Sequence, residues 1–405
     1  MNQELIMTGD QQSSKKVAVV YHYFAHYREP VIRELLRSPQ HEYHFFADTQ
    51  SFNSGIKLTE IDSEFFTRTK CIKFGPMLFQ WSLLKLALSR RYKTLILLGN
   101  CKWPTMWLAA VLGRVTGKRV LFWTHGWLKY ETGVQALIRN SFYKLGHGLL
   151  LYGHRAKCIG VDYGFSPERL HVIYNSLDCD LQDQTRDSLK SDTREQTRAQ
   201  YFPGREEYPV LVNITRLQRH KKLDQLIHAA AALESQGQPV NVLVVGDGPD
   251  KDELERLASK LGVHARFTGA VYGEDELGRI LISSDIAVMP GPIGLLAMHA
   301  LAYGVPAISN DNYDKQMPEF ESIIDGKTGG FFSEDNLDSL VQTIGDQLAI
   351  EWTHEQRMSA ARELIERFYN PVSQRILIDR AAAGEPADDL FNASIQRYTR
   401  SGGEA

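Results

Sequence analysis

Residues 291–296 give the clearest indication of a functional site in this chain. There a glycine-rich turn separates a strand pattern from a helical one. The apolar run DIAVMP before it predicts a buried parallel strand, and helical spacing begins at about Leu295. Gly291 and Gly294 break the chain between the two. A strand, a glycine turn and a helix start direct backbone N–H groups, including those of Leu295 and Leu296, toward one point that suits an anion. The alternative interpretation is an ordinary strand-to-helix turn.

Charged and polar side chains follow several other predicted strands. Arg216 lies just past one strand, and Lys221 lies five residues further on. His125 directly follows the strand LFWT, where it could orient a hydroxyl or stabilise charge, although an isolated histidine is usually structural. A last group follows two more strands of the first half of the chain: His22, His26, Tyr27, Arg28, Asn100 and Lys102.

The elements that position these residues alternate between strand and helix, which predicts the α/β class with doubly wound parallel sheets. Ligands of such sheets bind at the carboxyl ends of the strands, where the polar residues above are found. Strands are predicted at 15–23, 43–48, 66–74, 93–99, 118–126, 149–153, 209–216, 240–250, 263–271, 286–290 and 306–310, with helical patterns between them.

The length of 405 residues exceeds what one core normally supports, so two domains are expected. A polar, charged segment at 182–207 is the best candidate for a linker. It separates a first domain at 15–181 from a second domain at 208–370. Residues 1–14 are expected to form a disordered leader, and 371–405 a helix that crosses back to the first domain, followed by a polar tail.

Composition is that of a soluble globular protein, with 43% hydrophobic and 23% charged residues. No apolar run approaches the ~18 residues of a membrane span, and the polar start lacks an export signal, so we expect a cytoplasmic protein. The four cysteines form no C-x-x-C pair, which argues against a zinc site or a disulfide framework. Residues 1–180 carry 23 Lys and Arg against 14 Asp and Glu, whereas the rest carries 23 against 35. A basic first half indicates an anionic partner, unless the imbalance arose by chance on solvated faces.

Five segments, in the right order and spacing, resemble motifs of the retaining family 4 (group 1) glycosyltransferases of the GT-B class. The resemblance is strong over 170–335 and weak over the first 150 residues. It implies two Rossmann-like domains that face a central cleft, the first for the acceptor and the second for a nucleotide-sugar donor. The matching segments are VIYNSLD (172–178), NITRLQRHKKLDQLIHA (213–229), VVGDGP (244–249), FTGAV (267–271), and MPGPIGLLAMHALAYGVPAI (289–308) followed by QMPEFESIIDGKTGGFF (316–332).

The resemblance implies that Arg216 and Lys221 clamp the donor diphosphate, and that His125 lies against the donor sugar and the acceptor. Lys222 leaves the register of the lysine open. The structural alternatives are solvated charges, turn chemistry or packing at each position. Donor-binding residues would be Gly246, Asp247, Val271, Tyr272, Gly291, Gly294, Leu295, Leu296, His299 and Glu319. Acceptor-side candidates would be His22, His26, Tyr27, Arg28, Asn100 and Lys102.

One departure concerns the family's Glu-x7-Glu motif, whose positions are occupied here by Gly291 and His299. In the family the first acid touches the donor sugar and the second commonly touches the ribose. His299 could still hydrogen-bond a ribose or a phosphate, or the site could be inactive.

The implied activity is a retaining transfer of sugar from a UDP- or GDP-linked donor to a saccharide or polyprenyl-diphosphate-linked acceptor in surface polysaccharide biosynthesis. No metal or other cofactor and no nucleic acid is expected, and the D-x-D formed by Asp178 and Asp180 is discounted because it lies in the junction motif. Aromatic and basic residues at 81–93 and 127–157 indicate either a peripheral contact with the inner face of a membrane or ordinary packing helices. Two alternatives stay open: a GT-B-fold nucleotide-sugar epimerase, which needs paired carboxylates in the cleft, and a non-catalytic nucleotide-sugar-binding subunit.

Overall fold

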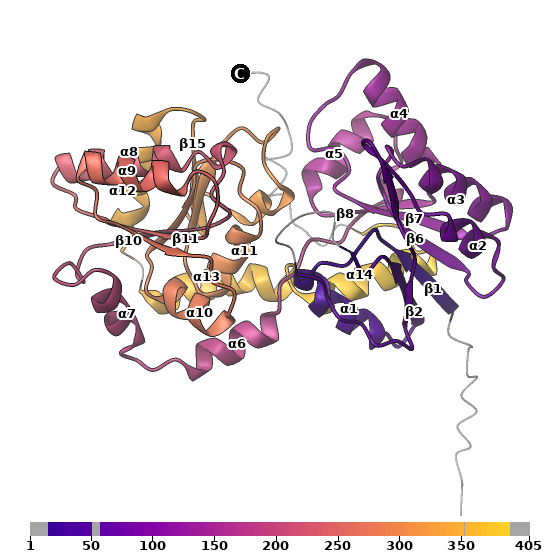
Figure 1. Ribbon diagram of the computed structural model, residues 1–405, viewed down its shortest axis with the longest axis horizontal. Coiled ribbons are helices and arrows are strands. Elements are labelled where there is room, and N and C mark those ends of the chain that lie inside the picture. Colours follow the sequence, from indigo (N-terminus) through magenta and orange to yellow (C-terminus); the bar gives the residue numbers. More distant parts are fainter. Residues whose placement is uncertain (1–14, 51–56, 352, 389–405) are drawn as a thin grey trace, which may run out of the picture.

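The computed structural model describes residues 15–50, 57–351 and 353–388, which form two α/β domains side by side (Figure 1). The first domain holds a seven-stranded sheet in the order β3-β2-β1-β6-β7-β8-β9, and the second a six-stranded sheet in the order β12-β11-β10-β13-β14-β15. Neighbouring strands are parallel throughout both sheets. The strand order reverses between β1 and β6 in one sheet and between β10 and β13 in the other, and ligands bind at such switch points. The predicted class is therefore confirmed.

The strands of the first sheet are β1 (Lys15–Val20), β2 (His41–Ala47), β3 (Phe66–Arg68), β6 (Thr94–Leu98), β7 (Arg119–Thr124), β8 (Gly148–Leu151) and β9 (Leu170–Val172), with a separate hairpin of β4 (Ile72–Phe74) and β5 (Met77–Phe79). Its helices are α1 (Glu29–Leu36), α2 (Ser82–Leu88), α3 (Pro104–Val115), α4 (Gly133–Lys144) and α5 (His154–Asp162). Short 3-10 helices are η1 (His26–Arg28) and η2 (Pro167–Arg169).

The strands of the second sheet are β10 (Val210–Ile214), β11 (Asn241–Val245), β12 (Ala265–Gly269), β13 (Ile286–Met289), β14 (Ala307–Asn310) and β15 (Gly329–Phe332). The helices are α6 (Cys179–Ser188), α7 (Thr193–Tyr201), α8 (Leu223–Ser235), α9 (Lys251–Leu261), α10 (Glu274–Ile282), α11 (Leu295–Ala302), α12 (Leu337–Ala349), α13 (His354–Arg367) and α14 (Pro371–Ala383). Two 3-10 helices, η3 (Arg219–Lys221) and η4 (Pro318–Ser322), lie in its loops.

Each sheet is covered by helices on both faces, which is why strands such as β8 (GLLL) and β13 (IAVM) are almost wholly apolar. In β1, Val17 and Val19 belong to the core layer that includes residues of α1 and α14. Ala18 and Val20 face the opposite layer, with residues of α2 and α3. Because helices cover both faces of each sheet, functional side chains are expected in the loops at the strand ends.

The chain crosses between the domains twice, and Gln374 of α14 joins the two crossings. Its Nε2 donates to the Tyr174 carbonyl at 2.7 Å, and its Oε1 accepts from Ser176 Oγ at 2.6 Å. Helix α13 packs against α11 of the second domain, and α14 packs against α1 and strands β7–β9 of the first (Figure 1). The expected return of the C-terminal helix to the first domain is thus confirmed.

In place of the linker expected at 182–207, the structure has helices α6 and α7, and both pack against α10 of the second domain. The charges that suggested a linker are neutralised there. Arg194 and Arg198 each pair with Asp285 at 2.5 Å, and both also donate to main-chain carbonyls after α10. The leader predicted at 1–14 and residues 389–405 of the predicted tail lie outside the described residues.

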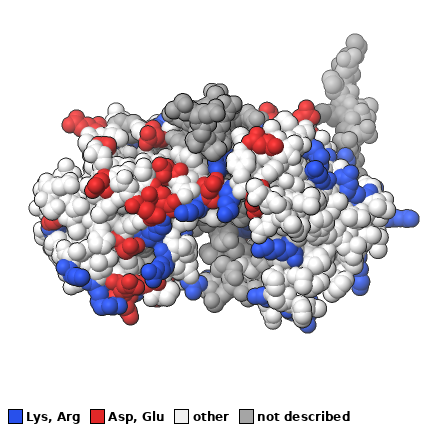
Figure 2. Space-filling model, turned by 90° about the horizontal axis from the view of Figure 1, so that it is seen from above, with Lys and Arg blue, Asp and Glu red and all other residues white. Residues whose placement is uncertain are grey.

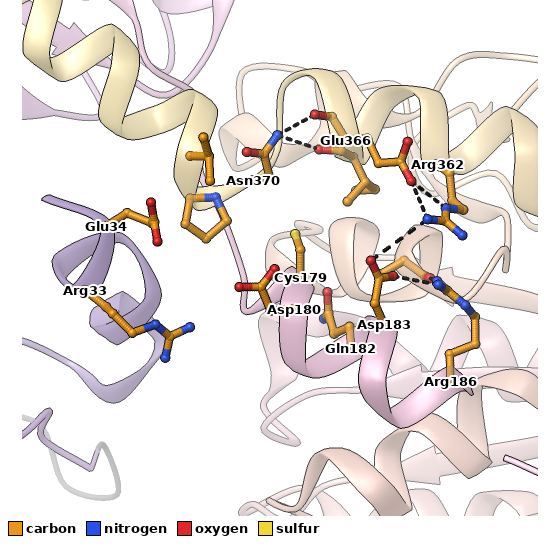
Figure 3. A pocket seen from close by; sticks show the side chains of 14 residues that line it. Arg33, Glu34, Cys179, Asp180, Gln182, Asp183, Arg186, Arg362, Glu366 and Asn370 are labelled. Carbon is orange, nitrogen blue, oxygen red and sulfur yellow. Dashed lines mark hydrogen bonds and ion pairs between the residues drawn. The ribbon is translucent and has the colours of Figure 1, made fainter. Parts of the chain in front are cut away.

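A cavity of about 190 Å³ lies at the domain connection, between α1, α6, α13 and the start of α14 (Figure 3). Its charged side chains are largely paired with one another: Asp183 with Arg186 at 2.7 Å and with Arg362 at 3.9 Å, and Arg362 also with Glu366. None of the site residues predicted from the sequence lines this cavity.

Candidate active site

The glycine turn after β13 is packed so tightly against η3 that position 291 accepts only glycine. A Cβ on Gly291 would lie 2.3 Å from the His220 carbonyl oxygen and 2.7 Å from the Lys221 Cα. The Gly291 N–H donates to the Lys221 carbonyl at 2.9 Å. The glutamate that the family motif carries here therefore does not fit this chain path, which gives the departure at Gly291 a physical cause.

Lys221, rather than Lys222, faces this turn. Its Nζ donates to the Pro292 carbonyl at 2.8 Å, and burial lowers its pKa. The neighbouring Lys222 bonds Glu334 at 2.7 Å and Asp335 at 2.6 Å instead. The open question about the lysine register is thereby answered: only Lys221 lies beside Gly291 and the start of α11.

A buried polar network fixes the turn beside Lys221. Asn310 Nδ2 donates to the Pro290 carbonyl at 2.7 Å, and Ser309 Oγ donates to the Gly291 carbonyl at 3.2 Å. Gln316 accepts from the Ile293 N–H at 2.8 Å. Sequence reasoning missed these three side chains, although Asn310 ends a predicted strand and Gln316 begins a matched motif.

Helix α11 begins directly after this turn, and its N-cap residue, Gly294, has no side chain with which to cap the first N–H groups. The N–H groups at the start of a helix carry partial positive charge and need acceptors. Together with the Lys221 ammonium they form a site for an anion. Arg216 lies exposed after β10, the strand next to β13.

A second glycine turn, at Gly246 after β11, packs against the main chain of Thr215, next to Arg216. A Cβ on Gly246, whose φ is +144°, would lie 1.8 Å from the Thr215 carbonyl oxygen. Asp247 is exposed, and its carbonyl accepts from the Leu217 N–H at 3.0 Å. This turn holds the segment that carries Arg216.

His299 is engaged by a carboxylate that sequence reasoning did not single out. Its Nε2 lies 2.9 Å from Glu274 Oε1, and the Tyr303 hydroxyl donates to the same oxygen at 2.8 Å. Burial would raise the pKa of Glu274, but the hydrogen bonds from His299 and Tyr303 lower it below its usual value. Nearby, Val271 packs on the core of the second domain, while Tyr272 is exposed with the Lys57 ammonium 5.0 Å from its ring centroid.

Glu319 is buried where the two domains meet. Its Oε1 accepts from Asn175 Nδ2 at 2.8 Å, while its Oε2 has no hydrogen-bond partner among the described residues. Burial raises the pKa of Glu319. Next to it, the Glu321 carboxylate accepts from the His154 and Arg155 N–H groups at the start of α5, so a second-domain acid caps a first-domain helix.

The first domain contributes a cavity of about 420 Å³ at the carboxyl ends of β1, β6, β7 and β8. Four of the predicted residues line it together: Arg28, Asn100, Lys102 and His125. Asp314 and Met317 of the second domain close one side. The cavity residues that sequence reasoning missed include Tyr21, Trp123, Lys129, Glu131, Arg139 and Tyr152, most of which lie in strands or loops without a motif.

His125 is open to this cavity and its ring centroid lies 4.8 Å from that of Tyr152. The surrounding protein and, to a lesser extent, the Arg28 cation lower its pKa to about 4. The imidazole is therefore neutral near pH 7 and can accept a hydrogen bond from a hydroxyl.

Three predicted acceptor-side residues do not line the cavity. His22 packs edge-on against Trp103, with ring centroids 5.2 Å apart. His26 lies exposed with its Nδ1 3.4 Å from the Lys57 carbonyl, and Tyr27 is half-buried beside it. Of the four residues predicted from the loop after β1, the structure thus brings only Arg28 into the cavity.

Asp178 of the discounted D-x-D caps α6 and accepts two hydrogen bonds of 3.0 Å from Arg33. In the described part of the chain, no three His, Cys, Asp or Glu side chains are grouped as metal ligands would be. The same residues contain no helix with the length and apolar character that crossing a bilayer requires.

Known proteins share this architecture and part of this sequence. Residues 194–364 match the family model of glycosyl transferases group 1. The chain is 31% identical over 170 residues to a GDP-mannose-dependent alpha-(1-6)-phosphatidylinositol monomannoside mannosyltransferase of Mycolicibacterium smegmatis, covering 39% of this chain and 43% of that protein. It is 29% identical over 179 residues to the sulfoquinovosyl transferase SQD2 of Arabidopsis thaliana, covering 43% and 33%. The aligned part is thus less than half the length of these relatives.

Among solved structures, HepE of Anabaena in complex with UDP is similar over 91% of this chain and 99% of its own, with a TM-score of 0.67 at 15% identity. A glycosyltransferase from Rickettsia africae ESF-5 is similar over 92% and 99%, with a TM-score of 0.68 at 16% identity. This is the GT-B architecture. The chain therefore has the GT-B fold, and its residues 194–364 are similar to the glycosyl transferases group 1 family.

Proposed function

We propose that the chain is a retaining glycosyltransferase that moves a sugar from a UDP- or GDP-linked donor to a saccharide or lipid-linked saccharide acceptor in surface polysaccharide biosynthesis. The observation that carries the proposal is the convergence of Lys221, the glycine turn and the uncapped start of α11 on one point of the second domain. The printed names of the relatives support such a donor, since one uses GDP-mannose and a structural neighbour binds UDP.

The site suits departure of a diphosphate. Glycosyl transfer builds positive charge on the sugar and negative charge on the leaving oxygen, and preorganised positive groups at that oxygen lower the barrier most. Lys221 and the N–H groups of Leu295 and Leu296 would provide them, with Arg216 as a second cation. In the proposed step the acceptor oxygen attacks from the face that the diphosphate leaves, and the leaving phosphate takes the hydroxyl proton. No metal or other cofactor is required in this proposal.

The described first-domain surface suits a contact with a membrane. Helices α3 and α4, joined by Trp107 and Phe142, expose Val115 by 79%, Val134 by 70% and Leu137 by 67%. Residues 1–180 contain more Lys and Arg than Asp and Glu, and Figure 2 shows blue basic side chains on the first domain. Apolar side chains among basic ones favour the interface of an anionic bilayer, so we place the protein in the cytoplasm, peripheral to the inner face of the membrane.

Vesicle sedimentation tests the membrane contact. Wild-type protein is expected to bind vesicles with anionic lipid and not zwitterionic ones, and Leu137→Glu to reduce that binding. Leu337→Glu, on exposed α12 of the second domain, is the matched control and is expected to bind like wild type. Equal binding by both variants would remove this part of the proposal.

Calorimetry with UDP and GDP, followed by product analysis with a panel of donors with and without chelator, tests the activity itself. We expect binding of one nucleotide and chelator-resistant transfer with retained anomeric configuration. Interconversion of the free donor would instead indicate an epimerase. Binding without turnover or donor hydrolysis would indicate a non-catalytic subunit.

A further inference from the structure

The cavity of the first domain contains hydrogen-bond donors in excess. Arg28, Lys102 and Lys129 line it, and neither lysine ammonium makes a hydrogen bond or ion pair with another described residue, although the Lys102 main-chain N–H donates to Asn100 Oδ1 at 3.0 Å. The guanidinium of Arg28 lies 4.9 Å from the Tyr21 ring centroid and 5.2 Å from that of Trp123. Arginine and lysine only donate, so these three side chains require acceptors.

The two carboxylates of the cavity are already neutralised. Glu131 forms a two-pronged pair with Arg139, at 2.7 and 2.8 Å. Asp314 pairs with Arg155 from across the domain boundary. Within the described chain the Arg28 guanidinium has only the Tyr152 hydroxyl as a hydrogen-bond partner, and the nearby Glu319 carboxylate lies beyond ion-pair distance. The cavity therefore contains cations that the protein itself does not neutralise.

Two residues that line the cavity also carry a buried polar atom that meets no hydrogen-bond geometry among the described residues. Trp123 is 2% exposed, and its indole N–H has no hydrogen-bond partner among the described residues. The Tyr21 hydroxyl, on a side chain 3% exposed, meets no hydrogen-bond geometry either.

We propose that the acceptor carries an oxyanion, either a phosphate or diphosphate or a sugar carboxylate, and that this group is bound by Arg28, Lys102 and Lys129 while the attacking hydroxyl lies at His125. This inference rests on the proposed function and specifies its acceptor. The volume of about 420 Å³ is in the range of ligand pockets and accommodates a monosaccharide with such a group. The hydroxyl oxygen forms the new bond to the anomeric carbon as the bond to the leaving phosphate breaks, and the hydroxyl proton passes to that phosphate.

Binding at saturating UDP or GDP tests this inference, because the nucleotide then occupies the diphosphate site of the second domain. The probes are glucose 6-phosphate, inorganic pyrophosphate and glucuronate, with glucose as the neutral counterpart. We expect at least one anionic probe to bind tenfold or more tighter than glucose, with an affinity that falls as salt rises. The preferred probe distinguishes phosphate from carboxylate as the source of the charge. Equal affinity for glucose and all three anions would overturn the proposal.

Variants locate the binding. The double variant Lys102→Gln with Lys129→Gln is expected to weaken the preferred anion about tenfold and to leave UDP or GDP binding unchanged. Lys260→Gln makes the same charge change on exposed α9 of the second domain and is expected to behave as wild type. Arg28→Lys, which keeps the charge, is expected to weaken the anion less than Arg28→Gln does. Anion binding that survives the double variant, or that the nucleotide displaces, contradicts the proposal.

Nucleotide binding measured on the same samples distinguishes failure of the proposed function from failure of the acceptor assignment. If no nucleotide binds, the proposed function fails, and with it the acceptor assignment. If the nucleotide binds and sugar is transferred to neutral acceptors as fast as to their anionic counterparts, only the acceptor assignment fails.

Discussion

The two domains have nearly the same sheet topology, yet they build their halves of the cleft by opposite means. In the second domain the proposed binding site is formed mainly by the main chain. Gly291 and Gly246 let loops approach within contact distance, and α11 presents its N–H groups. In the first domain the cavity is lined mainly by side chains, such as Arg28 of η1 and Trp123 of β7, although two tightly packed glycines, Gly99 and Gly126, also line it. A binding site made of main chain constrains the sequence, whereas a site made of side chains can change without altering the path of the chain.

Exchange of Lys221 for alanine is expected to have the largest effect. In the proposed function the donor diphosphate binds at Lys221 and the turn beside it. Loss of this cation should therefore lower turnover by about 10²-fold or more. Lys222→Ala is the matched control, because that side chain bonds Glu334 and Asp335 instead. Steady-state kinetics with the cognate donor makes the measurement. Similar losses in the two variants would contradict the assignment.

Gly291→Glu restores the acid of the family motif and is expected to damage the enzyme rather than improve it. The new Cβ would collide with the His220 and Lys221 main chain, so we expect the free energy of unfolding to fall by about 1–3 kcal/mol and turnover to decrease. Gly345→Ala in α12 has room, with its nearest neighbour 3.6 Å away, and should be neutral or slightly stabilising. Chemical denaturation measures the stability of the variant, and steady-state kinetics measures its turnover. A Gly291→Glu variant as stable and active as wild type would show that the turn has room for a side chain at position 291.

His125→Gln probes the first domain, where single side chains should matter less. Loss of one hydrogen bond to the acceptor hydroxyl is expected to lower kcat/KM about tenfold. Because the pKa of His125 is lowered to about 4, the imidazole is neutral at pH 6–8, and protonation of His125 should reduce kcat/KM only as the pH approaches 4. The prediction would be contradicted if kcat/KM of the wild type fell at low pH with an apparent pKa near 6.5 and this fall were absent in His125→Gln. His125 would then be protonated near pH 6.5.

Acid stability should also differ between the domains. Burial lowers the pKa of His171, in β9 of the first domain, to about 4 from an unfolded value near 6.5. Its contribution to stability is complete above pH 6.5 and is lost as the pH falls toward 4, because the unfolded chain then binds the proton first. His171→Gln should therefore lower the dependence of unfolding free energy on pH by up to about 1.4 kcal/mol per pH unit in that window. Five of the six tryptophans lie in the first domain, so fluorescence-detected denaturation at several pH values follows it; an unchanged slope would contradict the cause given for the shift.

The same contrast explains what could be predicted from sequence. The fold followed from apolar strand runs such as VAVV and ILL, and the proposed donor side followed from glycines at 246, 291 and 294, of which tight packing requires the first two. The segment 182–207 was misjudged because helices that pair their charges with Asp285 have the composition of a linker. The engagement of His299 with Glu274 and the aromatic lining at Trp123 depend on tertiary contacts, for which no local pattern exists.

A crystal structure of the chain with UDP or GDP tests the central claim most directly. The account predicts that the diphosphate lies within hydrogen-bond distance of Lys221 Nζ and of the Leu295 or Leu296 N–H, with Arg216 beside it. A nucleotide bound away from η3 and the start of α11, for example in the cavity at Arg28 or at the domain connection, would contradict it.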